Sequence, residues 1–445
     1  MFDELASAID SLFPEVRSQL EDLVRIPSVS APGFDPGEVR RSAEATMELA
    51  EAAGMSGVRL LEHADAHPAV FAEIAAPEGA PTVLLYAHHD VQPAGPHTDW
   101  TINDPFEPEE RDGRLFGRGS ADDKSGIVMH LAAIRAHGSN PPVGVKLFVE
   151  GEEEIGSLHL TDFLAEHGEL LRADAIVIAD SANWRVGTPT LTTSLRGLVD
   201  CVVEVRTLEH GVHSGMFGGV VPDALTSLVR LLATLHDESG EVAIDGLVTG
   251  ESDPLDLTEA ELRQQAGVVD GVQLLGEGSL TTRMWTKPAA AVLAIDAPGV
   301  GEAINQLVPV ARAKVSVRIA PGDDPKRAMD ALVAHLEARA PWGASVTVTR
   351  GASGEAFALD TTGTAYDAYR QAFEFAWGKP TIDMGVGGSI PFVAAFADAY
   401  PDASILLTGV GDPTSGAHGP NESLDLEELR RGCLAEAIAL QLLAG

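Results

Sequence analysis

The stretch TVLLYAHHD, at residues 82–90, changes abruptly from apolar residues to two histidines and an aspartate. A short apolar run bounded by polar residues is typical of a strand that is buried on both faces of a sheet. The polar residues then lie where the chain leaves the sheet. Because ligands of open α/β sheets bind beyond the carboxyl ends of the strands, His88, His89 and Asp90 mark a candidate functional edge.

Three other apolar runs end in the same way. Residues 143–149 lead into an acidic run at 150–154, residues 175–179 lead into Asp180, and residues 405–408 lead through glycine-rich turns to His418. Helical patterns lie between the runs, near residues 125–137 and 158–166. Strands that alternate with helices predict an α/β fold with parallel strands.

The length of the chain, 445 residues, predicts two domains, because a single core rarely grows beyond about 250–300 residues. Longer, partly alternating strands occur at residues 190–206 and 307–320, with a helix at 223–236 between them. We therefore expect an inserted domain at residues 191–320. Residues 1–190 and 321–445 would together form a discontinuous first domain.

The composition excludes several classes of function. The net charge of −37 argues against binding to nucleic acid or to an anionic membrane surface, both of which require a basic face. No apolar run reaches the ~18 residues of a membrane-spanning helix. Cys201 and Cys433 form no CxxC pair, and the acidic, amphipathic start of the chain does not resemble a signal peptide. We expect a cytoplasmic protein.

The polar residues at the strand ends are zinc-type ligands, because they combine histidine with carboxylates. Asp122, in a glycine-rich turn before a helix, adds a further carboxylate. The set can hold two metals if one carboxylate bridges them, as in hydrolytic two-metal sites. Asp90 lies two residues after His88, so it can orient that imidazole.

Each of these residues also has an ordinary explanation. His88 can be a histidine satisfied within the core, and the acidic run at 150–154 can be a solvated face. Asp122 can be a helix N-cap, and Asp180 can be a turn residue. The metal hypothesis depends on their occurrence together.

Three segments form a recognisable pattern. Residues 87–93 (AHHDVQP) resemble the signature G-H-x-D-V-x-P, with Ala87 in place of the common glycine. Residues 112–124 (DGRLFGRGSADDK) resemble DG-x-x-x-GRG-x-x-DDK, and residues 150–157 (EGEEEIGS) resemble E-G-x-E-E-x-G-S. The chain thus resembles, over nearly its whole length, a family of dinuclear zinc metallopeptidases. The family includes carnosinase-like dipeptidases, aminoacylases, carboxypeptidase G and succinyl-diaminopimelate desuccinylase.

The resemblance implies a mixed, largely parallel sheet with helices on both faces and an inserted α+β domain that acts as a lid and dimerisation surface. It also implies two Zn²⁺ ions per subunit, with Mn²⁺ or Co²⁺ as alternatives. His88 and Asp180 would bind one ion, and Glu154 and His418 the other. Asp122 would bridge both.

The resemblance also assigns catalytic roles. Glu153 would be the general base, Asp90 would support His88, and the Asp122–Asp123 peptide bond would be cis. His213 lies in GVHSGMFGG, at residues 211–219, which resembles D-x-H-S-G-x-F-G-G. In the family this histidine stabilises the oxyanion in the active site of the other subunit, so a homodimer is implied.

Further positions match residues near the substrate in the family: Asn305, Arg318, Gly387, Gly388 and Ser389. Many relatives have an arginine just before these glycines, where this chain has Gly385 and Val386. The substrate would be a small peptide or an N-acyl amino acid. We expect a metal-dependent dipeptidase. Two alternatives are an N-acyl-amino-acid deacylase and a catalytically silent dimer that binds metal or peptide.

Overall fold

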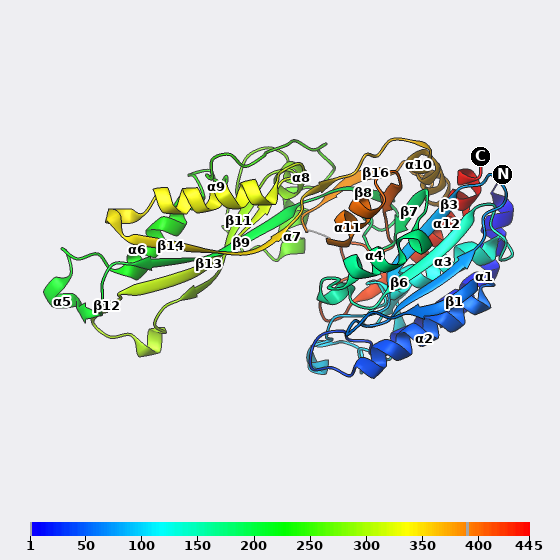
Figure 1. Cartoon of the computed structure of the whole chain (residues 1–445), viewed down its shortest axis with the longest axis horizontal. Helices are drawn as coiled ribbons and strands as arrows, with labels where there is room; N and C mark the ends of the chain where they lie inside the picture. Colours follow the sequence, from blue (N-terminus) through cyan, green and yellow to red (C-terminus); the bar gives the residue numbers. More distant parts are fainter. Residues whose placement is uncertain (1, 389–390) are drawn as a thin grey trace. The chain divides into compact units, whose positions relative to one another are not determined.

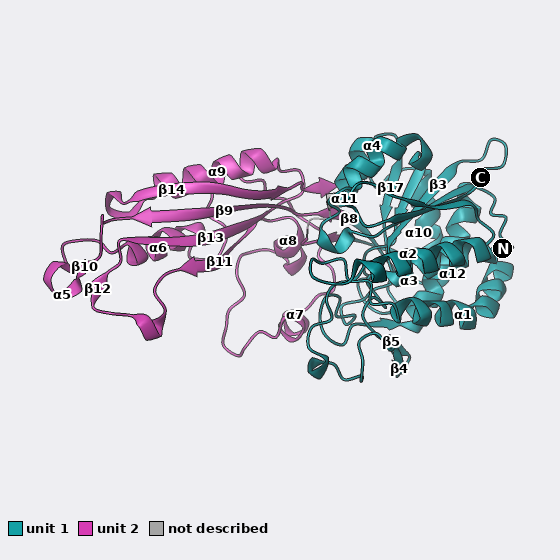
Figure 2. Ribbon diagram, turned by 60° about the horizontal axis from the view of Figure 1, so that its bottom comes forward, with its two compact units in different colours: residues 1–193, 359–384, 391–445 teal, residues 194–358, 385–390 magenta. Residues whose placement is uncertain are grey.

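The structure is a computed structural model that describes residues 2–388 and 391–445. The chain divides into two compact units, which are coloured separately in Figure 2. Unit 1 comprises Met1–Thr193, Leu359–Met384 and Pro391–Gly445, and unit 2 comprises Ser194–Ala358 and Gly385–Ile390. The predicted substrate residue Ser389 lies outside the described residues.

The larger sheet has the strand order β1-β2-β6-β3-β7-β17-β8-β15, and β16 also pairs with β8. Its strands are β1 (Ser56–Leu61), β2 (Ala69–Ile74), β3 (Thr82–His88), β6 (Gly144–Glu150), β7 (Ala175–Ile178), β8 (Thr190–Leu195), β15 (Phe357–Ala358), β16 (Ile382–Val386) and β17 (Ser404–Leu407). The neighbouring strands β6, β3, β7 and β17 are parallel. β1 and β2 pair antiparallel with their neighbours, and β8 pairs antiparallel with β17 and β15. The expected mixed, largely parallel sheet is confirmed.

Helices cover both faces of this sheet (Figure 1). On β3, Val83, Leu85 and Ala87 belong to the core shared with the helices of one face. Tyr86 points to the opposite face, where its ring stacks on Phe392 at 4.8 Å. The first face carries α1 (Asp3–Val24), α2 (Pro36–Ala52), α3 (Lys124–Ala136), α10 (Thr364–Trp377) and α12 (Leu426–Leu443), and the second carries α4 (Leu160–Leu171) and α11 (Pro391–Ala399).

Unit 1 also contains a small antiparallel sheet in the order β18-β5-β4. It pairs a segment near the C-terminus with one near residue 115, and so joins two loops at the functional edge. Its strands are β4 (Glu109–Arg111), β5 (Arg114–Phe116) and β18 (Ser423–Asp425), and the 3₁₀ helices of this unit are η1 (His97–Asp99) and η2 (Glu153–Ile155).

Unit 2 is built on an antiparallel sheet in the order β11-β13-β9-β14, covered by α6 and α9. Its elements are β9 (Gly197–Arg206), β10 (Val212–His213), α5 (Ser214–Phe217), α6 (Ala224–Leu232), η3 (Ala233–Leu235), α7 (Glu259–Ala266), α8 (Leu280–Trp285), β11 (Ala289–Asp296), η4 (Val300–Glu302), β12 (Gln306–Leu307), β13 (Val310–Ile319), α9 (Pro325–Ala338), η5 (Pro341–Gly343) and β14 (Ser345–Gly354). Antiparallel strands with helices beside them make this unit α+β, as expected for the insertion.

The expected end of the inserted domain, near residue 320, differs from the structure. β14 pairs with β9 along its length, for example Val348 with Val203. Leu332 and Leu336 of α9 are fully buried in the core of unit 2. Residues 321–358 therefore belong to unit 2, because strand pairing and apolar burial hold them there.

None of the helices among the described residues is long and apolar enough to cross a membrane. Cys201 and Cys433 are both free and buried. The cytoplasmic location expected from the sequence stays a prediction.

Candidate metal centre

The five proposed metal ligands come from five separate segments of unit 1. His88 is the last residue of β3, Glu154 lies in η2 just after β6, and Asp180 follows β7. Asp122 lies in the turn before α3, and His418 lies in the loop after β17. Since β6, β3, β7 and β17 are parallel neighbours, their carboxyl ends bring these segments to one edge of the sheet.

The ligand atoms form two groups that share Asp122. One group is His88, Asp122 and Asp180, the other is Asp122, Glu154 and His418, and in each group the atoms lie within 4.8 Å of one another. Asp122 points one oxygen at each histidine: Oδ1 lies 3.0 Å from His88 Nε2, and Oδ2 lies 3.0 Å from His418 Nε2. Glu154 Oε2 also lies 3.0 Å from His418 Nε2. This is the arrangement of a carboxylate that bridges two metal positions.

The electrostatics of the cluster also fit a metal site. Burial, with contributions from the charges of Asp122 and Glu154, raises the pKa of Asp180 to about 7. Hydrogen bonds that it donates to the carboxylates of Asp122 and Glu154 raise the pKa of His418 to about 10. Asp180 is thus buried beside carboxylates that disfavour its ionisation, whereas hydrogen bonds to His418 and His88 outweigh burial and hold the pKa of Asp122 below its usual value. Divalent cations relieve the repulsion at Asp180.

Asp90 orients His88 from beyond the end of the strand. His88 Nδ1 lies 3.1 Å from the backbone oxygen of Asp90 and 3.3 Å from its Oδ1. The other oxygen, Oδ2, accepts hydrogen bonds from Ser30 Oγ at 2.6 Å and from the backbone N–H of Glu154 at 3.0 Å. We expected this contact within a strand, but β3 ends at His88, so the turn that follows creates it. Asp90 thereby links two ligand-bearing segments.

The neighbouring His89 is turned away from the cluster. Its Nε2 lies 2.9 Å from the backbone oxygen of Pro68, and the side chain is fully buried. Burial lowers the pKa of His89 to about 4, so it stays neutral. Only the first histidine of the pair therefore reaches the candidate metal positions.

Glu153 lies beside the cluster and remains partly accessible. Its Oε2 is 3.9 Å from His88 Nε2, and 18% of its side chain is exposed. Burial and the negative charge of Asp180 raise the pKa of Glu153 to about 9. The peptide bond between Asp122 and Asp123 is cis, as the resemblance implied.

The remaining predicted site residues belong to unit 2, where they fall into two groups. The β10–β12 pairing brings His213 and Asn305 together, and the backbone N–H of Ser214 donates to the backbone oxygen of Asn305 at 3.0 Å. His213 Nδ1 accepts the backbone N–H of Gly215 at 3.0 Å, so a neutral His213 carries its proton on Nε2. His213 and Asn305 are both exposed.

The second group is Arg318, on β13, with Gly387 and Gly388. The sequence did not indicate a third member, Arg196, which lies between β8 and β9. A Cβ on Gly387 would lie 2.7 Å from Arg196 Nη2, so the guanidinium packs directly against this turn. Burial and the positive charge of Arg318 lower the pKa of Arg196 to about 10. The sequence analysis treated residues 190–206 as one strand, whereas the structure ends β8 at Leu195 and begins β9 at Gly197, which leaves Arg196 between them.

Residues 84–441 match the model of peptidase family M20/M25/M40. The chain belongs to this family. It is therefore a metallopeptidase, which confirms the enzyme class and the family expected from the sequence.

Individual relatives agree with this assignment. The M20 chain is 40% identical over 367 residues to the cysteinylglycine-S-conjugate dipeptidase of Corynebacterium striatum. The matched region covers 80% of this chain and 80% of the relative. It is 30% identical over 380 residues to the Beta-Ala-His dipeptidase of Rattus norvegicus, covering 80% of this chain and 76% of the relative. Among solved structures, the dipeptidase Dug1p of Saccharomyces cerevisiae matches with a TM-score of 0.80 at 25% identity, covering 100% of this chain and 98% of that one.

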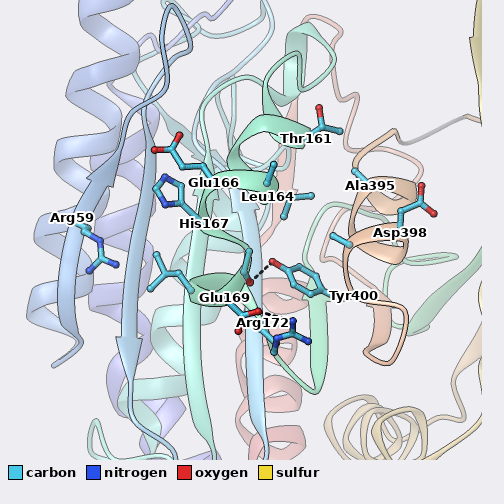
Figure 3. Close-up of a pocket in the computed structure, with 14 residues that line it drawn as sticks. Arg59, Thr161, Leu164, Glu166, His167, Glu169, Arg172, Ala395, Asp398 and Tyr400 are labelled. Atoms are coloured by element: carbon cyan, nitrogen blue, oxygen red, sulfur yellow. Dashed lines mark hydrogen bonds and ion pairs between the residues drawn. The ribbon is translucent and has the colours of Figure 1, made fainter.

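A groove elsewhere in unit 1 contains none of these site residues. It lies between α4 and α11, has a volume of about 760 Å³, and is lined by residues that include Arg59, His167 and Tyr400 (Figure 3). Tyr400 donates a hydrogen bond to the backbone oxygen of Gly168 at 2.9 Å across it. The size of a cavity therefore does not locate the chemistry of this M20 peptidase.

Proposed function

We propose that this metallopeptidase hydrolyses the peptide bond of free dipeptides with two zinc ions. The observation that carries the proposal is the pair of ligand groups that share Asp122, with Glu153 beside them. All three relatives described above are named as dipeptidases, which supports the choice of substrate class.

His88 and Asp180 would hold one ion, Glu154 and His418 the other, and Asp122 would contact both. This mixture of imidazole and carboxylate donors suits zinc, and manganese or cobalt accept the same donors. When bound, the ions would polarise the scissile carbonyl and lower the pKa of the attacking water.

Glu153 would act as the general base. It lies close enough to the cluster to accept a proton from the attacking water, and its partial exposure gives it access to the substrate. Bound cations would oppose the effect of Asp180 and would lower the pKa of Glu153 toward the neutral range that suits a base. The same carboxyl would then protonate the leaving amine.

Unit 2 would contribute oxyanion stabilisation and dimerisation. The Nε2 proton of a neutral His213 is available to a developing oxyanion, because Nδ1 is used within the turn. The edge strand β11 exposes Val292, Leu293 and Ile295, an apolar row that a second copy of the chain would cover. We infer a homodimer in which His213 serves the active site of the other subunit.

The two guanidinium groups of Arg196 and Arg318 would hold the free carboxylate of the substrate. They lie near one another, because the positive charge of Arg318, together with burial, lowers the pKa of Arg196. Among the described residues, neither guanidinium forms an ion pair with a carboxylate, and Arg196 Nη1 donates instead to the backbone oxygen of Lys287 at 3.4 Å. Beside the Gly387–Gly388 turn, they would supply the positive charge that many relatives obtain from an arginine just before these glycines. Asn305 would lie near the substrate beside His213.

The test is turnover of free dipeptides, dipeptide amides and N-acyl amino acids by the purified protein, with and without chelation and with zinc or manganese added back. We expect metal-dependent cleavage of free dipeptides and little cleavage of the amides. Cleavage confined to N-acyl amino acids would make the protein a deacylase. Hydrolysis of none of them by protein with two bound ions would contradict the proposal and favour a silent binding protein.

A further inference from the structure

Arg118 and Glu422 form a buried ion pair next to the metal ligands of unit 1. Their side chains are 1% and 0% exposed, although 304 positions separate them in the sequence. Neither residue is a proposed ligand, base or substrate contact. A buried ion pair is costly to form, so the contacts that it makes with the rest of the chain are informative.

Glu422 binds the turn that carries Asp122. Its Oε1 accepts the backbone N–H groups of Ala121 and Asp122, at 2.9 and 3.1 Å. Its Oε2 accepts the N–H of Gly119 at 3.1 Å and a guanidinium N–H of Arg118. All four partners are donors, so the site is built for a carboxylate, and Glu422 holds the backbone of the turn that carries the candidate bridging ligand Asp122.

Arg118 extends the same contacts to two other ligand-bearing segments. Its Nη2 donates to the backbone oxygen of Gly419, next to His418, at 3.0 Å. It also lies 3.4 Å from the oxygen of Pro93, in the segment that follows His88. The face of Trp100 covers the guanidinium, with the ring centre 5.6 Å from Cζ.

We propose that Arg118 and Glu422 are positioning residues that set the spacing of the two metal positions. The pair joins residues 88–93, 117–122 and 418–422, which hold three of the five candidate ligands. Asp122 contributes to both positions, so a small shift of its turn would disturb both ions at once. The inference rests on the proposed dinuclear site and adds the residues that hold it in register.

Replacing Glu422 with glutamine tests this role without changing the volume of the side chain. The amide presents an NH₂ group to a site that contains only donors, so at least one donor loses its acceptor and the turn relaxes. Loss of a group that orients metal ligands typically lowers metal affinity by about 10–100-fold. We expect a fall of this size for at least one of the two zinc ions.

Glu428→Gln is the matched control. Glu428 is also fully buried, and it accepts hydrogen bonds from Asn183, Trp377 and the backbone N–H of Gly187. Residues 183–187, which it holds, contain no candidate ligand. This substitution should therefore lower the midpoint of thermal unfolding without changing zinc affinity.

The experiment titrates each metal-free protein with zinc against a chromophoric chelator, and measures the unfolding midpoint of the same samples. The inference is overturned if Glu422→Gln binds two ions with wild-type affinity, or if both variants lose affinity equally. Arg118→Lys serves if Glu422→Gln does not fold, because lysine keeps the charge but cannot bridge Glu422 and Gly419 in one plane. Wild-type affinity in that variant is equally contradictory. A wild-type protein that binds fewer than two ions overturns the proposed site itself, and this inference with it.

Discussion

The metal cluster of unit 1 and the candidate substrate residues of unit 2 are held in different ways. His88 and Asp90 are completely buried; His88 Nε2 lies 3.0 Å from Asp122, and Asp90 accepts hydrogen bonds from Ser30 and from the backbone N–H of Glu154. His213 and Asn305 are exposed and are fixed mainly by a two-residue strand pairing and a turn. Bond chemistry requires groups that are already in place, whereas recognition requires surfaces that another molecule can reach.

The largest difference between the two groups should appear when Asp122 is replaced by alanine. Because both candidate metal positions use this carboxylate, we expect both ions to be lost and turnover to fall to background. Metal content per chain and the rate of dipeptide hydrolysis measure the two effects. A variant that retains two ions would show that Asp122 does not bridge them.

Glu153→Gln should separate chemistry from metal binding inside unit 1. We expect kcat to fall by about 10²–10⁴-fold, the usual contribution of a general base, with metal content unchanged. The metal-free protein should not be destabilised, because the substitution removes a carboxyl whose charge burial and Asp180 disfavour. Retained turnover would remove Glu153 from the mechanism.

His213→Ala should lower kcat by about 10²–10³-fold, the loss typical of an oxyanion donor, without any change in metal affinity. His210→Ala is the control, because His210 is an exposed histidine in the same segment. Steady-state kinetics of the two variants give the comparison. Equal activity of both variants would show that His213 of unit 2 does not take part in catalysis.

The smallest expected effect concerns a second buried histidine–carboxylate pair of unit 1, His130 and Glu436. This pair should contribute to the free energy of unfolding in a pH-dependent way without any metal. His130 Nδ1 lies 2.7 Å from Glu436 Oε1, and its Nε2 lies 3.0 Å from the backbone oxygen of Tyr86. Burial lowers the pKa of His130, but the charge and hydrogen bond of Glu436 outweigh this and raise it above its usual value. A raised folded pKa means that the stabilisation is complete below the unfolded value of about 6.5 and is lost as the pH rises through the folded value.

Denaturant unfolding of the chelator-treated protein checks this prediction. The difference in free energy of unfolding between wild type and Glu436→Gln should be largest near pH 6 and should shrink at alkaline pH. Each unit by which the pKa is raised corresponds to about 1.4 kcal/mol. A difference that is independent of pH would mean that His130 is not charged in the folded protein.

The sequence predicted the functional edge well because the apolar run that forms each strand is followed directly by the polar residues that mark its end. The expected strand at residues 82–87 corresponds to β3 (Thr82–His88), and the histidine that follows the apolar run is its last residue. The expected ligands meet in space because parallel neighbours end at one edge. Local pattern and global arrangement coincide there.

Elsewhere the structure depends on information that no local pattern contains. The assignment of β14 to unit 2 follows from its pairing with β9, more than a hundred residues away. β11 was missed because both of its faces are largely exposed, so its sequence AAAVLAID carries no alternation. Glu422 was missed because a single glutamate after His418 looks like any surface acid until the turn at residues 119–122 is seen to enclose it.

The position of Asp122 between His88 and His418 has a thermodynamic consequence. A carboxylate that serves two ions makes their binding equilibria interdependent. If the first ion changes the orientation of Asp122, it also changes the affinity of the second position for its ion. Linkage requires the effect to be reciprocal. Zinc should therefore load in two coupled steps, and the half-loaded protein should be a distinct species with its own affinity rather than a mixture of two independent sites.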